Sequence, residues 1–375
     1  MVVICILVLF VQHPSSPGRG LLMPAGGPPT IRKISEKYDK VFELEGVIQS
    51  LKSIERHFNR WYHYLYVFLN DGDFNSTFKE TVQNHTSSSV EFGKIDSSMW
   101  GFPDWIDPRV AKEGIAKQGD AAIMYGGMES YHSMCRYYSG FFYKHELLQN
   151  YEWYWRLELE IKYFCDITYD PFQKMIENNK TYGFTIAVKE LKETVPNIFR
   201  YASAYMRTNN IKSKRLWEMF VEPDLEGPKK KRPEDTLGYK PPIPEPILRK
   251  GSSLPDVDPE AMEGEKYNMC HFWSNFEIAS LSWFRSEEYE DFFQMMDRSG
   301  GFWMERWGDA PIHSLAAGAL LSPSQQDEYW DSWDDPKENG VGCRCRCDTA
   351  IVDVEGKEES CMAEWVDVAG GWASP

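Results

Sequence analysis

The sequence lacks an excess of basic residues, and this absence excludes one large class of proteins. Its 375 residues include 41 Lys and Arg against 57 Asp and Glu, for a formal net charge of −16. Proteins that bind nucleic acid without sequence preference need a basic face that releases counterions from phosphate groups. We therefore expect no nucleic-acid partner. An acidic protein can still bind a nucleotide diphosphate when a divalent cation lies between the two.

The sequence also lacks a hydrophobic run long enough to cross a membrane. Residues 1–11 (MVVICILVLFV) are apolar, but a span needs about 20 such residues. No basic flank identifies them as a signal peptide. We interpret residues 1–43 as an apolar stub followed by a linker rich in Pro, Gly and Ser. Internal repeats are absent as well.

The cysteines lack the spacing of an ordinary zinc knuckle. Four of the eight gather near the C-terminus, namely Cys343, Cys345, Cys347 and Cys361. The alternating C-R-C-R-C pattern has no two-residue gap, so we favour disulfides over a zinc site. Sequons at Asn75, Asn84 and Asn179 also favour a secretory compartment. We interpret residues 322–375 as an acidic, cysteine-rich tail.

Aromatic residues are abundant, at 15% of the chain, and this supplies ample apolar surface for a core. Apolar residues recur at helical spacing over 44–58, and a short apolar run at 64–69 predicts a buried strand. Helix then strand is half of a β/α repeat, so we expect an α/β fold with a mixed, mainly parallel sheet flanked by helices. Further strands are predicted within 151–165 and 182–188, and an exposed insertion at 222–266.

Two acidic patterns are candidates for the chemistry. Glu158 and Glu160 lie two residues apart after an aromatic run, and would point the same way toward a divalent cation if the strand continues that far. A solvated strand edge is the competing interpretation. Glu277 lies between Phe276 and Ile278, where a carboxylate can act as a nucleophile or stabilise an oxocarbenium-like centre. Alternatively, Glu277 belongs to the first turn of a helix capped by the polar residues before it.

Two further segments combine polar side chains with aromatic surroundings. Asp309 precedes Ala-Pro and could cap a helix that carries His313; a lone histidine is more often a satisfied core residue than a ligand. Tyr131 and Arg136 can hold a diphosphate or a sugar hydroxyl, with the arginine as a bidentate fork. The same helix could equally be a core element.

Seven motifs in one order resemble a known family. They are residues 102–107 (FPDWID), 134–143 (MCRYYSGFFY), 154–156 (YWR), 169–172 (YDPF), 182–186 (YGFTI), 271–277 (HFWSNFE) and 305–311 (ERWGDAP). Together they are similar to the fungal α-1,2-mannosyltransferases of glycosyltransferase family 15. The resemblance extends over residues 44–321, interrupted by the insertion, and defines the expected catalytic domain.

The resemblance implies a GT-A type fold, a GDP-mannose donor, Mn²⁺ and a retaining transfer in the Golgi lumen behind an N-terminal membrane anchor. By position, Glu277 falls on the proposed nucleophile and Glu158 on a metal ligand. Tyr131 and Asp309 fall on positions tied to the donor or to catalysis, so the expected catalytic set is Glu277, Asp309 and Tyr131. Tyr131, Arg136 and Arg156 are the expected donor-binding set. Glu160 departs from the family pattern and inherits no role.

Two departures from the family bear on activity. The apolar first strand of the nucleotide pocket is replaced by polar residues 35–43, so this strand is expected to be missing. The segment with the metal-binding histidine, reading like D-I-G-Y-x-H, is replaced by residues 322–327 (SPSQQD). The metal shell is thus expected to be incomplete.

Two hypotheses follow. The first is a retaining α-1,2-mannosyltransferase that acts on a mannosylated glycoprotein or glycolipid. The alternative is a catalytically impaired or non-catalytic lumenal relative, or an incomplete gene model of an active protein. The acceptor is open between N-linked glycans, O-linked glycans and glycolipids.

Overall fold

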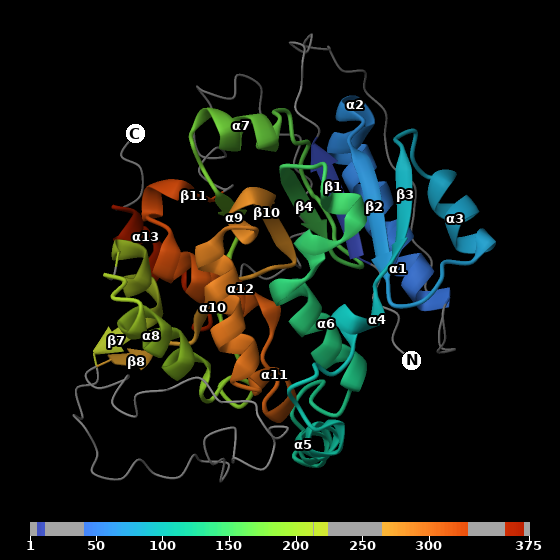
Figure 1. Cartoon of the computed structure of the whole chain (residues 1–375). Coiled ribbons are helices and arrows are strands. Elements are labelled where there is room, and N and C mark those ends of the chain that lie inside the picture. Colours follow the sequence, from blue (N-terminus) through green and yellow to red (C-terminus); the bar gives the residue numbers. More distant parts are fainter. Residues whose placement is uncertain (1–5, 12–40, 213, 224–264, 329–356, 371–375) are drawn as a thin grey trace.

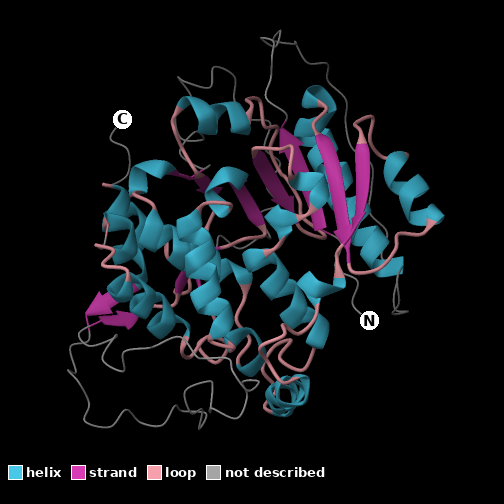
Figure 2. Cartoon of the chain, in the orientation of Figure 1, coloured by secondary structure: helices cyan, strands magenta, loops and turns pink. Residues whose placement is uncertain are grey.

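The computed structural model describes residues 6–11, 41–212, 214–223, 265–328 and 357–370. These residues form a central sheet with helices on both faces (Figures 1 and 2). The strand order is β11-β5-β10-β4-β1-β2-β3. In chain order the strands are β1 (Ile6–Val11), β2 (Leu65–Asn70), β3 (Val90–Lys94), β4 (Trp153–Leu157), β5 (Tyr182–Phe184), β10 (Phe276–Ser280) and β11 (Gln326–Glu328).

The sheet is mixed, as expected, but its neighbouring strands are mainly antiparallel. β2 pairs with β3 and β5 pairs with β11 in parallel. The pairings β1–β2, β1–β4, β4–β10 and β5–β10 are antiparallel. Only β1 and β10 run against the other strands. The carboxyl ends of β2, β3, β4 and β5 therefore share one edge with the amino ends of β1 and β10.

The interpretation of the first apolar residues as a stub is corrected by β1. The apolar segment interpreted as a stub supplies Ile6–Val11, which pairs with β2 on one side and β4 on the other. Without it, the inner edges of β2 and β4 would carry unpaired backbone groups, which are costly to bury. Because β1 is antiparallel to both neighbours, its last residues lie at the opposite edge from the carboxyl ends of β2 and β4, with Phe10 opposite Leu65.

The two faces of the sheet bury separate cores, because side chains alternate along a strand. Trp153 and Trp155 of β4 join one core, together with Tyr66 and Phe68 of β2. Tyr154 joins the larger core on the other face. The aromatic residues that predicted the strand therefore alternate between the two faces of the sheet. Arg156 lies on the same face as Tyr154.

The helices divide between the two faces. The smaller core is covered by α1 (Val41–Ile54), α3 (Ser76–Gln83) and α7 (Pro171–Glu177). The helix predicted from residue 44 is thus confirmed in α1. The larger core is packed by α5 (Pro108–Asp120), α6 (Glu129–Gly140), α8 (Ile198–Thr208), α10 (Glu287–Arg298), α11 (Gly301–Met304) and α12 (Asp309–Leu320). The short helices are α2 (Arg60–Tyr62), α4 (Ser97–Trp100) and α9 (Leu281–Phe284).

Two small sheets complete the described part. β6 (Ala187–Lys189) pairs with β9 (Cys270–Phe272), and β7 (Val221–Pro223) pairs with β8 (Glu265–Tyr267). The strand predicted over 182–188 is therefore divided between β5 and β6, which belong to different sheets. The predicted insertion at 222–266 begins and ends in the β7–β8 pair, and residues 224–264 lie outside the described residues.

The segment interpreted as a tail contributes to the folded domain. β11 extends the main sheet, and α13 (Met362–Ala369) buries Met362, Trp365 and Val368 against the larger core. Cys361 forms a disulfide with Cys270 of β9. The polar composition concealed this role because only a few apolar residues of the segment make the contacts. Cys343, Cys345 and Cys347 lie outside the described residues.

Candidate active site

The candidate site forms where β4 ends and β10 begins. The two strands are antiparallel neighbours, with Phe276 opposite Leu157 and Glu277 opposite Arg156. Since residues directly opposite each other project to the same face, Glu277 and Arg156 both project toward α6 and α12. The residues predicted from two distant motifs are thus brought together by strand pairing.

Glu277 is completely buried and its carboxylate is held by three side chains. Tyr154 and Tyr182 donate hydroxyl hydrogen bonds to Oε1 and Oε2 respectively. His313 Nδ1 lies 2.8 Å from Oε2. Because Glu277 lies within β10, the alternative in which it begins a capped helix is wrong. The residues around Glu277 come from neighbouring strands, and not from the end of a helix.

Burial and charge act in opposite directions on Glu277. Desolvation raises the pKa of its carboxyl group, and the charge and hydrogen bond of His313 oppose that rise. The negative charge of Asp309 adds to the increase. Glu277 is therefore a buried carboxylate whose protonation depends on its histidine partner.

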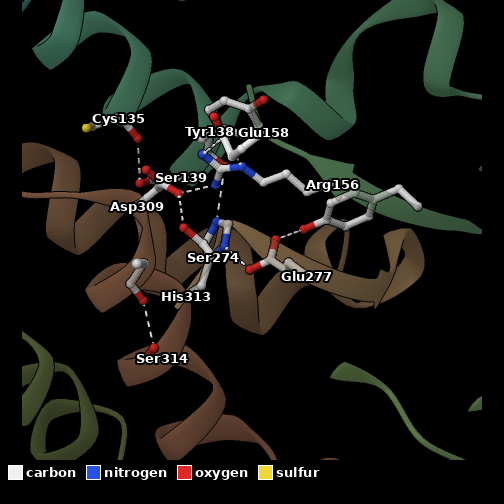
Figure 3. Close-up of polar contacts among 12 residues, drawn as sticks. Cys135, Tyr138, Ser139, Arg156, Glu158, Ser274, Glu277, Asp309, His313 and Ser314 are labelled. Atoms are coloured by element: carbon white, nitrogen blue, oxygen red, sulfur yellow. Dashed lines mark hydrogen bonds and ion pairs between the residues drawn. The ribbon is translucent and has the colours of Figure 1, made fainter. Parts of the chain in front are cut away.

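Arg156 joins two carboxylates in the centre of the site (Figure 3). Its Nε lies 2.7 Å and its Nη2 2.6 Å from Glu158 Oε1, and its Nη1 binds Asp309 Oδ2. The guanidinium also lies 3.8 Å from the ring centroid of Tyr138. Burial alone would lower the pKa of Arg156, but Asp309 and Glu158 outweigh it and hold the pKa well above its usual value. The arginine is therefore permanently charged.

Asp309 is the first residue of α12, and Ser274 Oγ donates a hydrogen bond to Oδ2 over 2.9 Å. Burial would raise the pKa of Asp309, yet Arg156 and His313 lower it below the usual value. The positive end of the helix dipole adds to this preference for the charged form. The predicted helix carrying His313 is confirmed, but Asp309 does not cap it, because its carboxylate is engaged by Arg156 and Ser274.

Glu158 and Glu160 do not form a pair. β4 ends at Leu157, and Glu160 adopts a left-handed backbone conformation at φ 60° with an exposed side chain. The prediction that both carboxylates point the same way is therefore wrong, because the strand stops before them. Glu158 stays partly exposed beside Arg156, with 18% of its side-chain surface accessible.

Glu158 is suited to share a divalent cation with a phosphate ligand. Its Oε1 is engaged by Arg156, whereas Oε2 takes part in no hydrogen bond among the described residues. Divalent cations such as Mg²⁺ are often bound by one or two carboxylates together with substrate phosphates. The only group of three candidate metal ligands in the described part of the chain is Cys270, Cys361 and Glu364. Two of these are the disulfide cysteines, so that group offers no thiolate to a metal.

Tyr131 lies at the start of α6 on the outer side of the same site. Arg306 Nη1 donates to its hydroxyl over 3.3 Å, and Arg306 also forms an ion pair of 3.3 Å with Glu190. The ring of Tyr131 stacks on exposed Tyr125, with 4.8 Å between centroids. Tyr131 is electrostatically coupled to Asp309, so it borders the acidic centre without bonding to it.

Arg136 is placed elsewhere, in a buried ion pair. Its Nε and Nη2 bind the two carboxylate oxygens of Asp297 at 2.7 and 2.9 Å, and the guanidinium lies over the ring of Phe141. The bidentate fork expected to hold the donor is thus occupied in packing α6 against α10. The assignment of Arg136 as a donor-binding residue is not supported.

Several residues of the site were not predicted from sequence. Tyr154, Tyr182 and Ser274 lie within the quoted motifs, but no pattern assigned them a contact. His313 was considered and interpreted as a core residue; it is fully buried and also bonds Glu277. The signal that could have identified it is its position one turn after Asp309 in α12. The alternative that this helix is a core element is confirmed for Cys135 and Tyr138, which are buried, whereas Tyr131 is only partly buried.

The sequence of this chain is similar to that of one family of known proteins. Residues 37–370 match the sequence profile of the family described as glycolipid 2-alpha-mannosyltransferase. The chain is 48% identical over 338 residues to an O-glycoside alpha-1,2-mannosyltransferase homolog 4 of Schizosaccharomyces pombe, covering 88% of this chain and 75% of that protein. It is 38% identical to a glycolipid 2-alpha-mannosyltransferase of Saccharomyces cerevisiae, covering 88% and 67%.

Solved structures show the same fold. The Mn/GDP form of core-mannan synthase A from Aspergillus fumigatus superimposes with a TM-score of 0.71 at 31% identity, covering 88% of this chain and 82% of that one. The mannosyltransferase Ktr4p of S. cerevisiae in complex with GDP gives 0.69 at 29% identity, covering 87% and 79%. The expected α/β glycosyltransferase fold is confirmed. In the described part of the chain, no helix has the length and apolar character needed to cross a bilayer.

Proposed function

The chain belongs to the glycolipid 2-alpha-mannosyltransferase family, and on this basis we propose that it transfers mannose from GDP-mannose to a mannose-containing acceptor. The new linkage is α-1,2, and the anomeric configuration of the donor is retained. It is an enzyme of the hexosyltransferase class. The observation that carries the proposal is the single acidic centre in which Arg156 joins Glu158 to Asp309 beside buried Glu277.

The charges of this centre suit a sugar transfer. Cleavage of a glycosyl bond develops positive charge at the anomeric carbon, which nearby carboxylates stabilise. Glu277 lies close enough to Asp309 for the negative charge of Asp309 to raise the pKa of Glu277. We assign Glu277 the role of nucleophile or of fixed negative charge toward that carbon. Asp309, held by Arg156 and Ser274, supplies a second fixed carboxylate.

We propose that Glu158 binds the divalent cation, Mn²⁺, through the oxygen that Arg156 leaves available. A bound cation would neutralise negative charge on the departing diphosphate. Arg156 orients Glu158, because its Nε and Nη2 both bind the Oε1 atom of that carboxylate. The predicted metal histidine is replaced in this sequence, and no other described residue is assigned to the cation.

Tyr131 and Arg156 are the proposed contacts to the donor. The hydroxyl of Tyr131 is already oriented by Arg306, and tyrosine hydroxyls and arginine nitrogens are common partners of sugar hydroxyls and phosphates. Burial raises the pKa of Tyr131, so its hydroxyl keeps its proton and can donate a hydrogen bond at neutral pH.

The alternative of a non-catalytic relative is not favoured. Arg156 joins the carboxylates of Glu158 and Asp309 in one ion-pair network, Glu277 is buried beside it, and the relatives of this chain are transferases. A chain that had lost catalysis would be free to lose such a network, because buried charges contribute little to stability by themselves.

The enzyme belongs to the secretory pathway, and we propose the Golgi lumen with membrane association as its location. Exposed side chains at Asn75, Asn84 and Asn179 support a glycosylating compartment, since the sequons are accessible. The proposed acceptor is a mannosylated glycoprotein or glycolipid.

Transfer assays with GDP-mannose, Mn²⁺ and methyl α-mannoside test the proposal. We expect a disaccharide product that α-1,2-mannosidase cleaves. The Glu277→Gln variant should lower kcat by about 100-fold or more, because it removes a fixed charge at the reacting centre. Its affinity for GDP should stay close to wild type.

The matched control is Glu160→Gln, whose side chain is exposed and outside the network. This variant should retain full kcat. A purified protein that neither binds GDP in the presence of Mn²⁺ nor transfers mannose would refute the proposed function. Undiminished transfer by the Glu277→Gln variant would remove Glu277 from the chemistry.

A further inference from the structure

The contact between Glu277 and His313 has a defined proton arrangement. Both side chains are fully buried, and Nδ1 of His313 faces Oε2 of Glu277 at 2.8 Å. The other ring nitrogen, Nε2, lies 3.1 Å from the main-chain carbonyl of Tyr138. A carbonyl oxygen only accepts hydrogen bonds, so Nε2 carries a hydrogen.

One proton then lies between Nδ1 and the carboxyl group. It resides on the histidine, which gives an imidazolium and a carboxylate, or on Glu277, which gives two neutral groups. The remaining neighbours of Glu277 decide between these forms. Tyr154 and Tyr182 donate hydroxyl hydrogen bonds to its two oxygens, and donors to a carboxylate favour the charged form.

The formal charges around the pair come from two elements, α12 and β4. Asp309 lies one helical turn before His313 on α12, and the histidine lowers the pKa of the Asp309 carboxyl group. Arg156 of β4 balances Asp309 and is itself shared with Glu158. From α9 and α10, the rings of Phe284 and Tyr289 lie 4.9 and 6.3 Å from the imidazole centroid. These two residues supply no formal charge to the pair.

We propose that His313 is a positioning residue that holds the shared proton and thereby keeps Glu277 ionised and oriented for mannosyl transfer. This inference rests on the proposed role of Glu277. The backbone of α6 takes part, because the Tyr138 carbonyl fixes the ring orientation and the position of the second proton. A histidine interpreted as core packing is thus connected to the chemistry through the carboxylate.

Two substitutions separate the two hydrogen bonds of the ring. The amide nitrogen of Asn occupies the place of Nδ1, so His313→Asn keeps a donor to Glu277. The amide nitrogen of Gln matches Nε2, so His313→Gln keeps the contact with the Tyr138 carbonyl and loses the donor to Glu277. We expect kcat to fall by roughly 10–100-fold in His313→Gln, the cost of losing a hydrogen bond to a charged group. His313→Asn should lose less than about 10-fold.

The pH profile supplies a readout that a packing role would not change. Burial raises the pKa of Glu277 and His313 opposes that rise, so loss of the histidine donor should move the acidic limb of kcat to higher pH. The groups that face Glu277 and the ring are otherwise Tyr154, Tyr182, Asp309 and Tyr289. KM for GDP-mannose and the thermal midpoint should change alike in both variants. The inference would be overturned if kcat fell equally in the two variants and the acidic limb of the kcat pH profile did not move.

Nitrogen NMR of the wild-type protein tests the same inference without turnover. At neutral pH we expect both ring nitrogens of His313 to be protonated, and the Glu277→Gln variant to convert the ring to its neutral form. A neutral His313 in wild type would refute the proposed charge state even if transfer is normal. Absent transfer with a charged His313 would refute the proposed function instead.

Discussion

At the scale of single residues, Arg156 is the side chain that joins the acidic groups of the site. It is buried between the carboxylates of Glu158 and Asp309 and against the ring of Tyr138. Its planar fork reaches both acids at once, which a single ammonium group does not reproduce. Loss of the fork would leave a buried carboxylate without its partner, and this is costlier than the ion pair is favourable.

Substitution Arg156→Lys tests this geometry. We expect the free energy of unfolding to fall by about 3 kcal/mol, the cost of disrupting a buried ion pair, and transfer to be lost with it. Urea unfolding followed by tryptophan fluorescence measures the change.

The control is Arg109→Lys, which alters an arginine that pairs with Asp107 while its side chain is 90% exposed. Surface pairs contribute about 0–1 kcal/mol, so this variant should unfold like wild type. Similar losses in both variants would show that the buried fork has no special importance.

At the scale of elements, α6 connects two parts of the site. Its first turn presents Tyr131, and the carbonyl of Tyr138 binds His313 of α12. Arg136 fixes the same helix to α10 through Asp297. Figure 1 shows α6 beside α12 in the helical layer on this face of the sheet. The position of α6 therefore affects the proposed donor contact and the histidine together.

Gly140 sets how closely α6 approaches α10. A Cβ atom added there would lie 2.0 Å from the ring of Phe293, so Gly140→Ala forces the two helices apart. We expect a loss of about 1–3 kcal/mol in stability, typical of overpacking a core. Differential scanning calorimetry measures it as a lower Tm.

The comparison variant is Gly72→Ala, where the added atom meets only the Asn70 side chain, at 3.6 Å. This distance is an ordinary van der Waals contact, and a change within about 0.5 kcal/mol is expected. An unchanged Tm for Gly140→Ala would mean that α6 and α10 are not closely packed at this point.

At the scale of the whole molecule, segments far apart in sequence are held together by β11, α13 and one disulfide. Cys270 and Cys361 are 91 residues apart, and their bond fixes the start of α13 to β9. Trp365 of α13 then packs edge-on against Phe184 and Phe272. Since His271 and Phe272 lead directly into Ser274 and Glu277, the disulfide supports the chain segment that enters the site.

The double variant Cys270→Ser, Cys361→Ser tests this support. Loss of a native disulfide costs about 2–5 kcal/mol, chiefly because the unfolded chain gains freedom. We expect a lower denaturation midpoint and, at temperatures where the protein remains folded, nearly normal kcat. Peptide mapping under non-reducing conditions should identify the Cys270–Cys361 link in wild type. Two free thiols at these positions in the folded protein would contradict the structure.

The sequence by itself determined the class of fold and the residue types of the site. Helical periodicity predicted α1 and the aromatic run predicted β4, while the resemblance to the family implied roles for Glu158, Glu277 and Asp309. The first two signals are local, because they depend on the spacing of side chains along one strand or helix. The same locality explains why Glu160 was paired wrongly with Glu158, since where a strand ends depends on its partners.

Only the tertiary structure decided which charges meet. Glu277 is 36 residues from His313, and Arg156 is 153 residues from Asp309, so no local pattern relates them. The pairing of β10 with β4 determined that Glu277 belongs to a strand and not to a helix cap. Pairing with β2 and β4 likewise made the first apolar residues a strand of the sheet. In each case the outcome depended on hydrogen bonds between distant segments, which form only when the chain has folded.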